Sequence, residues 1–262
     1  MPASQGLFER EGDLLRPTSA ALGPWRPDAL HGGAVSALLG DSLGDDDWTM
    51  ARMTMDLLRR VPAEPLRLVK RAATTTRRML RTSVELWCDD RLVAKAEALS
   101  LAKAVLELPP QSRSVLEAPT DLDDEPLQYR DAIVDRVGYP SFVSEAVATR
   151  RQRLDPTRPH AFAYWLRLLL PAVVGEDVSP IQRVCAAADY ANGGFTNLSF
   201  EEWSFVSLDL TVQLVRSTVG DWVAVTTDSL AERTGVGLGD AELYDIAGRI
   251  GRATASLLVE KR

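Results

Sequence analysis

Two stretches of the chain are apolar around most of a helix, and runs that alternate between apolar and polar residues surround each of them. The first stretch covers residues 31–43 and begins with His31, Gly32 and Gly33. The second covers residues 179–194 and is also mostly apolar. A helix that lacks a polar face is buried on every side. We therefore expect two central helices, each enclosed by a curled antiparallel sheet.

Alternation with a period of two predicts the strands of these sheets. In the run 205–215, apolar residues at the even positions alternate with Ser207, Asp209, Thr211 and Gln213. This pattern predicts one continuous strand with an apolar face and a polar face. Further runs of the same kind cover residues 51–60, 65–72, 77–88, 91–101, 160–171, 221–230, 240–245 and 248–260.

The second half of the chain repeats the order of elements in the first half. Residues 53–57 align with residues 206–210, and residues 90–101 align with residues 248–258, which indicates an internal duplication. The stretch between the halves contains several prolines and a run of acidic residues, and it is too polar to form a core. We therefore predict an N-terminal domain at 1–108, a linker at 109–158 and a C-terminal domain at 159–262.

The composition limits the classes of function. The 262 residues carry a net charge of -7, which would repel a phosphate backbone, so we expect no nucleic-acid partner. The first residues lack the pattern of a secretory signal, and no apolar run approaches the ~20 residues of a membrane span. We therefore expect a cytoplasmic protein with no membrane partner, in which Cys88 and Cys185 are reduced core residues. With two histidines, no CxxC pair and no HExxH motif, we expect no metal site.

The two glycines at the start of the first helix are candidates for ligand binding. Gly32 and Gly33 have no side chains to shield the unpaired backbone N–H groups of the helix start, so a ligand oxygen could approach them closely. The alternative is that they only form a turn before a packed helix. His31, Gly32 and Gly33 could also belong to the oxyanion loop of an α/β-hydrolase, but the chain has no G-x-S-x-G nucleophile elbow, which excludes that fold.

Four segments in order resemble the type II acyl-CoA thioesterase family: HGGAVSALL, SPIQRVCAAADYANGG, LDLTVQLVR and GRIGRATASLLVE. The resemblance covers nearly the whole chain. It implies an α+β protein of two tandem hotdog folds, each a curled antiparallel sheet around a central helix. It also implies hydrolysis of fatty acyl-CoA thioesters in fatty acid metabolism, with acyl-CoA as the substrate and no cofactor. Because hotdog sheets have exposed edges, we expect a homo-oligomer.

The catalytic pattern of the family is an aspartate on the second helix, a serine or threonine on the next strand and a glutamine on the last strand. In this chain the resemblance places the aspartate at Asp189 and the hydroxyl at Ser207. The last position is Ala255, which can neither orient a water molecule nor bond to an intermediate. Either the first two residues suffice at a reduced rate, or a nearby amide such as that of Gln213 or Asn192 substitutes, or the protein binds acyl-CoA or an acyl chain without hydrolysing it.

The pattern of the family implies a water molecule that Ser207 holds and that Asp189, as general base, deprotonates. We expect the backbone N–H groups of Gly33 and Gly32 to hold the developing oxyanion across the junction of the two halves, and we count His31 with them as an oxyanion- or substrate-binding residue. The alternatives without a catalytic role are that Asp189 turns outward into solvent and that Ser207 lies on a solvent-exposed strand face. A further rival is a hotdog hydratase or dehydratase with His31 as the base.

Overall fold

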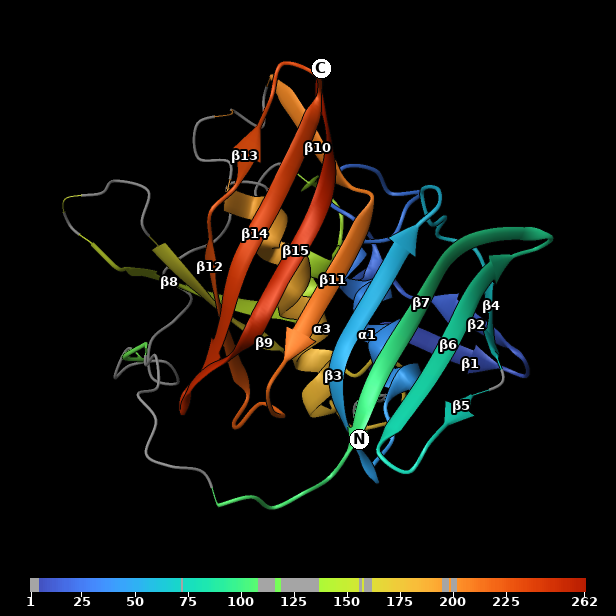
Figure 1. The fold of residues 1–262 in the computed structure, drawn as a ribbon. Coiled ribbons are helices and arrows are strands. Elements are labelled where there is room, and N and C mark those ends of the chain that lie inside the picture. Colours follow the sequence, from blue (N-terminus) through green and yellow to red (C-terminus); the bar gives the residue numbers. More distant parts are fainter. Residues whose placement is uncertain are drawn as a thin grey trace.

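The computed structural model describes residues 5–71, 73–107, 116–118, 137–155, 157, 162–194, 198 and 202–262. Within these residues the strands form a single large antiparallel sheet, which Figure 1 shows with the helices packed behind it. The main order of strands is β1-β2-β4-β6-β7-β3-β11-β15-β14-β12-β9-β8, and the short strands β5, β10 and β13 pair with β6, β15 and β14.

The first half contributes β1 (Phe8–Glu11), β2 (Leu14–Pro17), β3 (Trp48–Leu57), β4 (Leu66–Lys70), β5 (Thr74–Thr75), β6 (Met79–Cys88) and β7 (Arg91–Ala102). The second half contributes β8 (Val147–Arg153), β9 (Phe162–Leu168), β10 (Trp203–Ser207), β11 (Asp209–Leu214), β12 (Trp222–Thr227), β13 (Leu230–Ala231), β14 (Val236–Asp245) and β15 (Gly248–Lys261). The helices are η1 (Ser19–Ala21), α1 (Gly32–Leu43), η2 (Phe142–Ala146), α3 (Pro180–Ala188) and η3 (Asp189–Gly194).

The two halves join where β3 pairs with β11. The antiparallel register places Asp56 opposite Asp209 and Thr54 opposite Thr211, so the sheet of one half continues into the sheet of the other. Figure 1 shows this seam in the middle of the sheet, where a strand of the first half lies beside a strand of the second. The expected pair of curled sheets around central helices is therefore present.

The helices α1 and α3 pack against each other in opposite directions. At one end Ser179, which caps α3, donates a hydrogen bond to Asp41 near the end of α1, with 2.7 Å between Oγ and Oδ1. Midway, a Cβ on Gly40 would come within 2.5 Å of Cys185 Sγ, so the glycine permits close packing. The start of α1 therefore meets the end of α3, and both helices are largely buried, as their apolar sequences predict.

The stretch expected to be a linker contains regular structure near its end. Residues 108–115 and 119–136 lie outside the described residues, whereas η2 and β8 fall within 137–155. The strand β8 pairs with β9 at the edge of the sheet, where Val147 lies opposite Leu168. The packed part of the second half therefore includes residues before 159. None of the helices in the described part of the chain is long and apolar enough to cross a membrane.

Candidate active site

The carboxylate of Asp189 is buried between the two helices. Asp189 follows α3 directly and is 5% exposed. Its Oδ2 lies 3.3 Å from His31 Nδ1, and a Cβ on Gly32 would come within 2.5 Å of Oδ1. The carboxylate thus occupies the space that a side chain at position 32 would need, and it faces the first turn of α1. It does not turn outward, and the structure brings His31, Gly32 and Asp189 together.

Burial shifts the protonation of both titratable groups at this junction. Burial raises the pKa of Asp189 to about 6, against a smaller lowering by the backbone N–H of Gly33. Burial also lowers the pKa of His31 to about 4. At pH 7 the pair is therefore a carboxylate beside a neutral imidazole, and the positive end of the α1 dipole favours that carboxylate.

The ring of His31 is fixed on several sides. Its Nδ1 accepts a hydrogen bond from the backbone N–H of Gly33 at 2.9 Å, which makes His31 the cap of α1. The ring stacks on Phe142 with 4.5 Å between ring centroids, and it lies 6.1 Å from the ring of Tyr190. The N–H of Gly33, which we expected to meet an oxyanion, is therefore already directed at His31.

The second polar group consists of Ser207 and Asn192. Ser207 is the last residue of β10, is 8% exposed, and its Oγ accepts a hydrogen bond from Asn192 Nδ2 at 3.0 Å. Asn192 lies three residues after Asp189 in η3. Because a 3-10 helix has three residues per turn, these two side chains leave the helix on the same side. The Asn192–Ser207 pair therefore lies one turn of η3 after Asp189, and we call these three residues the Asp189 cluster.

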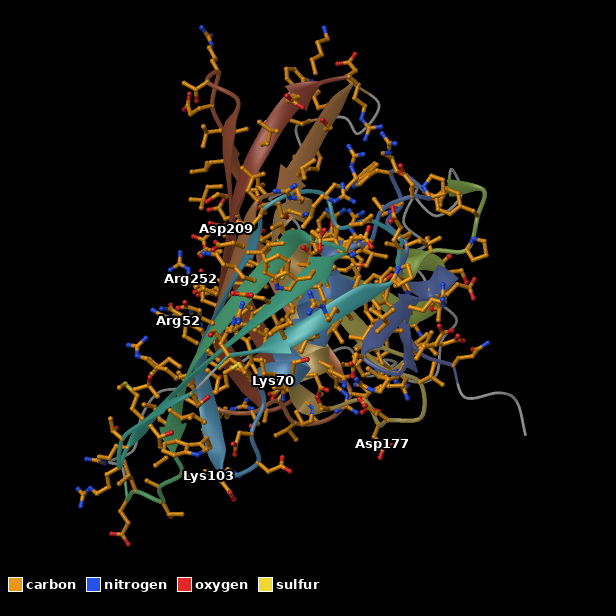
Figure 2. The ribbon with its side chains drawn as sticks, turned by 90° about the vertical axis from the view of Figure 1, so that its right-hand side faces the viewer. Arg52, Lys70, Lys103, Asp177, Asp209 and Arg252 are labelled. Atoms are coloured by element: carbon orange, nitrogen blue, oxygen red, sulfur yellow. The ribbon has the colours of Figure 1, made fainter. Side chains whose placement is uncertain are left out.

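The two candidate amides differ in their placement. Gln213 is exposed on the outer face of the sheet, opposite Arg52 on β3 and Arg252 on β15. Figure 2 shows both arginines directed away from the helices. Only Asn192 therefore lies beside Ser207.

Ala255 is buried on the inner face of β15, opposite Gly239 on β14. A Cβ on Gly239 would come within 2.8 Å of the carbonyl oxygen of Ala191, so η3 packs directly on this pair of small residues. Ala191, which precedes Asn192, thus packs against the sheet at Ala255, the position where the pattern of the family has a glutamine.

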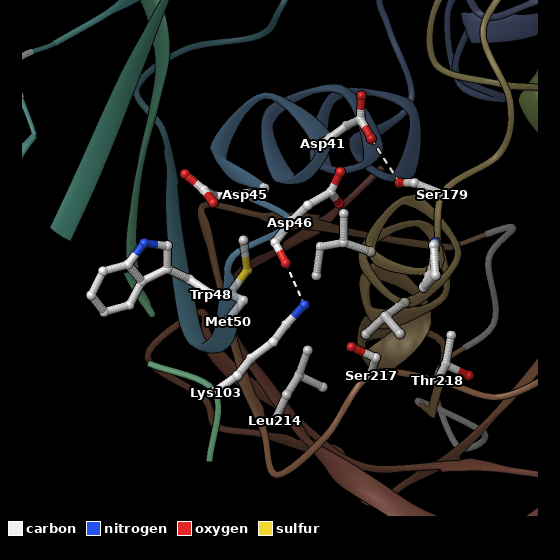
Figure 3. Close-up of a pocket in the computed structure, with 14 residues that line it drawn as sticks. Asp41, Asp45, Asp46, Trp48, Met50, Lys103, Ser179, Leu214, Ser217 and Thr218 are labelled. Carbon is white, nitrogen blue, oxygen red and sulfur yellow. Dashed lines mark hydrogen bonds between the residues drawn. The ribbon is translucent and has the colours of Figure 1, made fainter. Parts of the chain in front are cut away.

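A cavity of about 310 Å³ lies at the opposite end of the helix pair. Figure 3 shows Asp41, Asp45 and Asp46 near its rim, and Met50 and Leu214 are among its apolar lining residues. Lys103 spans part of it to reach the backbone oxygen of Asp46. Since this cavity lies at the end of α1 and the start of α3, it is separate from the Asp189 cluster.

Among the described residues, one group has the composition of a metal site. Side-chain atoms of Glu64, Cys88 and Asp89 lie within 4.8 Å of one another. The Cys88 thiol is 3.7 Å from Glu64 Oε2 and 4.0 Å from Arg91 Nη2, and burial together with the nearby carboxylates raises its pKa. A thiol that donates to Glu64 accounts for this arrangement. The group lies at the turn after β6 and has no member in the Asp189 cluster.

Sequence reasoning missed the two aromatic neighbours of His31. Tyr190 follows Asp189 directly, so its position in the second helix could have indicated it. Phe142 falls in the stretch taken as a linker, where its five-residue η2 is too short to produce a periodic pattern. The sequence pattern also predicted one continuous strand through Ser207, whereas β10 ends at that residue and β11 begins at Asp209.

Comparison with known proteins identifies both halves of the chain. The model of an acyl-CoA thioesterase N-terminal domain matches residues 21–101, and the model of an acyl-CoA thioesterase C-terminal domain matches residues 115–259. None of the curated proteins matches the sequence.

Several solved structures share the fold. A candidate thioesterase II from Thermobifida fusca aligns over 99% of both chains with 14% identity and a TM-score of 0.73. Acyl-CoA thioesterase II from Mycobacterium marinum aligns over 99% of this chain and 95% of its own with 16% identity and a TM-score of 0.65. A hot dog protein of unknown function from Alicyclobacillus acidocaldarius aligns over 97% and 95% with 11% identity and a TM-score of 0.66.

These likenesses confirm the tandem hotdog fold. The two domain models together cover most of the chain, in the order that the internal duplication predicts. The chain therefore belongs to the acyl-CoA thioesterase family.

Proposed function

We propose that the protein hydrolyses acyl-CoA thioesters to a free acid and coenzyme A, with Asp189 as the general base. The observation that carries this proposal is a buried carboxylate whose pKa is about 6, held against the start of α1 and one turn of η3 before Asn192, whose amide donates to the Ser207 hydroxyl. A base of this pKa is ionised at neutral pH and still accepts a proton from an attacking water molecule.

In the proposed reaction, a water molecule between Asp189 and Ser207 attacks the thioester carbonyl carbon and transfers its proton to the carboxylate. The C–S bond of the resulting tetrahedral intermediate breaks, and the proton passes from Asp189 to the leaving thiolate. Because Ser207 Oγ accepts from Asn192, its hydroxyl hydrogen is available to donate to the water or to the carbonyl oxygen.

The negatively charged oxygen of the tetrahedral intermediate needs hydrogen-bond donors in the same site. Donors at the start of α1 suit it, since one such N–H typically contributes about 3 kcal/mol. The N–H of Gly33 bonds to His31 Nδ1, so we propose that the developing charge either draws this N–H away from the imidazole or is met by the N–H of Gly32.

A non-catalytic acyl-CoA binding protein is the second candidate, and the alanine at position 255 favours it. The hydratase alternative has less support, because an imidazole with a pKa of about 4 whose Nδ1 already accepts a hydrogen bond is a weak base. Two further expectations remain proposals: a cytoplasmic location and a homo-oligomer, which light scattering would test. Of the expected domain limits 1–108 and 159–262, we keep the first as a proposal, and because β8 pairs with β9 we propose that the second domain begins before residue 159.

The test is to incubate the purified protein with acyl-CoAs of several chain lengths and to measure free thiol. Hydrolysis that Asp189→Asn removes, while acyl-CoA binding persists, supports the proposal. Tight binding without thiol release at any chain length supports the binding protein instead. Addition of water to an enoyl-CoA would indicate the hydratase.

A further inference from the structure

The strand that carries Ser207 changes its inward face at one point. On β10 the buried residues are Phe205 and Ser207, whereas on β11 they are Leu210, Val212 and Leu214. Inward positions are therefore odd before the break and even after it. A regular strand alternates strictly, so one residue of the chain must fall outside the repeat.

The register with β15 locates this extra residue. Ser207 lies opposite Leu257, and Thr211 lies opposite Thr254. Residues 207 and 211 are four positions apart in the sequence, whereas their partners on β15, residues 257 and 254, are three positions apart. One additional residue is thus accommodated at Leu208 and Asp209, which is a β-bulge. Val206 and Leu208 are 49% and 46% exposed on the opposite face.

The carboxylate of Asp209 closes the bulge against β15. Its Oδ1 accepts the backbone N–H of Ser256 at 2.6 Å, and its Oδ2 accepts the Ser256 hydroxyl at 3.0 Å. The backbone N–H of Leu208 donates to the carbonyl oxygen of Ser256 at 2.9 Å. Asp209 therefore satisfies a ladder N–H that the bulge would otherwise leave unpaired.

The consequence for Ser207 follows from the two-residue period of a strand. If the register of β11 continued without the bulge, Ser207 would lie on the same face as Thr211 and the exposed Gln213. Figure 2 shows Asp209 on this outer side, directed away from the helices. With the bulge, Ser207 turns inward to Asn192.

We propose that Asp209 is a positioning residue, which holds Ser207 in the active site by fixing this bulge. The inference rests on the proposed function for its kinetic meaning, whereas the orientation of Ser207 can be tested without any activity. A matched control is Asp56, which lies opposite Asp209 on β3 and pairs with Lys95 at 3.1 Å.

Thiol labelling tests the orientation. Val206→Cys and Ser207→Cys are each made in the wild-type, Asp209→Ala and Asp56→Ala backgrounds, since Cys88 and Cys185 are buried and add little signal. We expect position 206 to react at least about tenfold faster than position 207 in the wild-type and Asp56→Ala backgrounds. In Asp209→Ala the ratio should fall several-fold or reverse. An unchanged ratio in folded Asp209→Ala overturns the proposal.

If Asp209→Ala exposes the native cysteines by unfolding, Asp209→Ser replaces it, because the shorter side chain cannot make both contacts with Ser256. The same result is expected and the same unchanged ratio contradicts it. Asp209→Asn keeps an acceptor for the Ser256 N–H and should restore the wild-type ratio.

Kinetics give the second readout. Asp209→Ala should lower kcat about tenfold or more with little change in KM, and Asp209→Asn should recover most of it. Adding Ser207→Ala to Asp209→Ala should cause no further loss, whereas additive losses would show that Asp209 acts independently of Ser207. A wild-type protein without hydrolysis would refute the proposed function and leave the labelling result to decide the role of Asp209.

Discussion

The substitution Gly32→Ala tests the placement of the Asp189 carboxylate most sharply. A Cβ at position 32 would lie 2.5 Å from Oδ1, 2.8 Å from Oδ2 and 2.9 Å from Cγ of Asp189. Ordinary contact begins near 3.4 Å, so the carboxylate has to retreat by about 0.9 Å. A misplacement of about 1 Å at a reacting group can cost ~10²-fold in rate.

The same substitution should leave the protein folded. Overpacking at a filled site costs about 1–3 kcal/mol, which is less than the stability of an ordinary domain. Alanine is also a better helix former than glycine, which offsets part of this cost. We therefore expect kcat to fall by about two orders of magnitude while thermal unfolding remains cooperative.

The assay is steady-state thiol release from an acyl-CoA, combined with thermal unfolding followed by circular dichroism. Gly23→Ala is the matched control, since its nearest contact would be 3.4 Å and it lies in the segment that leads to α1. The control should retain wild-type activity. If Gly32→Ala also retains wild-type kcat, the carboxylate is not the reacting group or does not lie where the structure places it.

Two further predictions concern the pKa values and the amide. The raised pKa of Asp189 means that the folded state binds more protons than the unfolded state between about pH 4 and 6, so the contribution of Asp189 to stability falls as pH rises through that window. The lowered pKa of His31 has the opposite effect, so the contribution of His31 to stability rises from about pH 4 to 6.5. The two effects oppose each other in the wild type, and Asp189→Asn should unmask the His31 effect as a rise in urea midpoint from pH 4 to 6.5; a flat profile would contradict the assigned shifts. Asn192→Ala should lower kcat about tenfold with KM nearly constant, because Ser207 loses its hydrogen-bond donor. Gln213→Ala, on the outer face of the sheet, should change neither kcat nor KM. Equal effects of the two variants would show that neither amide has a specific role.

The sequence pattern predicted the main elements well where they are long. The helix expected at 31–43 is α1, which covers Gly32–Leu43, and His31 precedes it as the cap. The second helix was expected to continue to residue 194, but α3 ends at Ala188 and η3 follows. Apolar content alone does not distinguish an α-helix from a 3-10 helix, so the pattern did not predict this change.

The pattern of alternation did not predict the break in the strand at Leu208. Residues 206–214 alternate strictly between apolar and polar side chains, yet a bulge that Asp209 closes against β15 reverses the face of Ser207. Such a bulge depends on contacts with Ser256, which is remote in sequence. The strand β8 was missed for a related reason, since it pairs at the edge of the sheet and lies beside a proline-rich acidic stretch.

The acid limb of kcat/KM for acyl-CoA hydrolysis tests the role of Asp189 most directly, because it reports the ionisation of the free enzyme's base. We expect activity to fall as pH drops below about 6, the pKa of the buried carboxyl, and we expect Asp189→Asn to abolish the activity that shows this limb. An acid limb near pH 4, or an unchanged limb in Asp189→Asn, would contradict the assignment of Asp189 as the base.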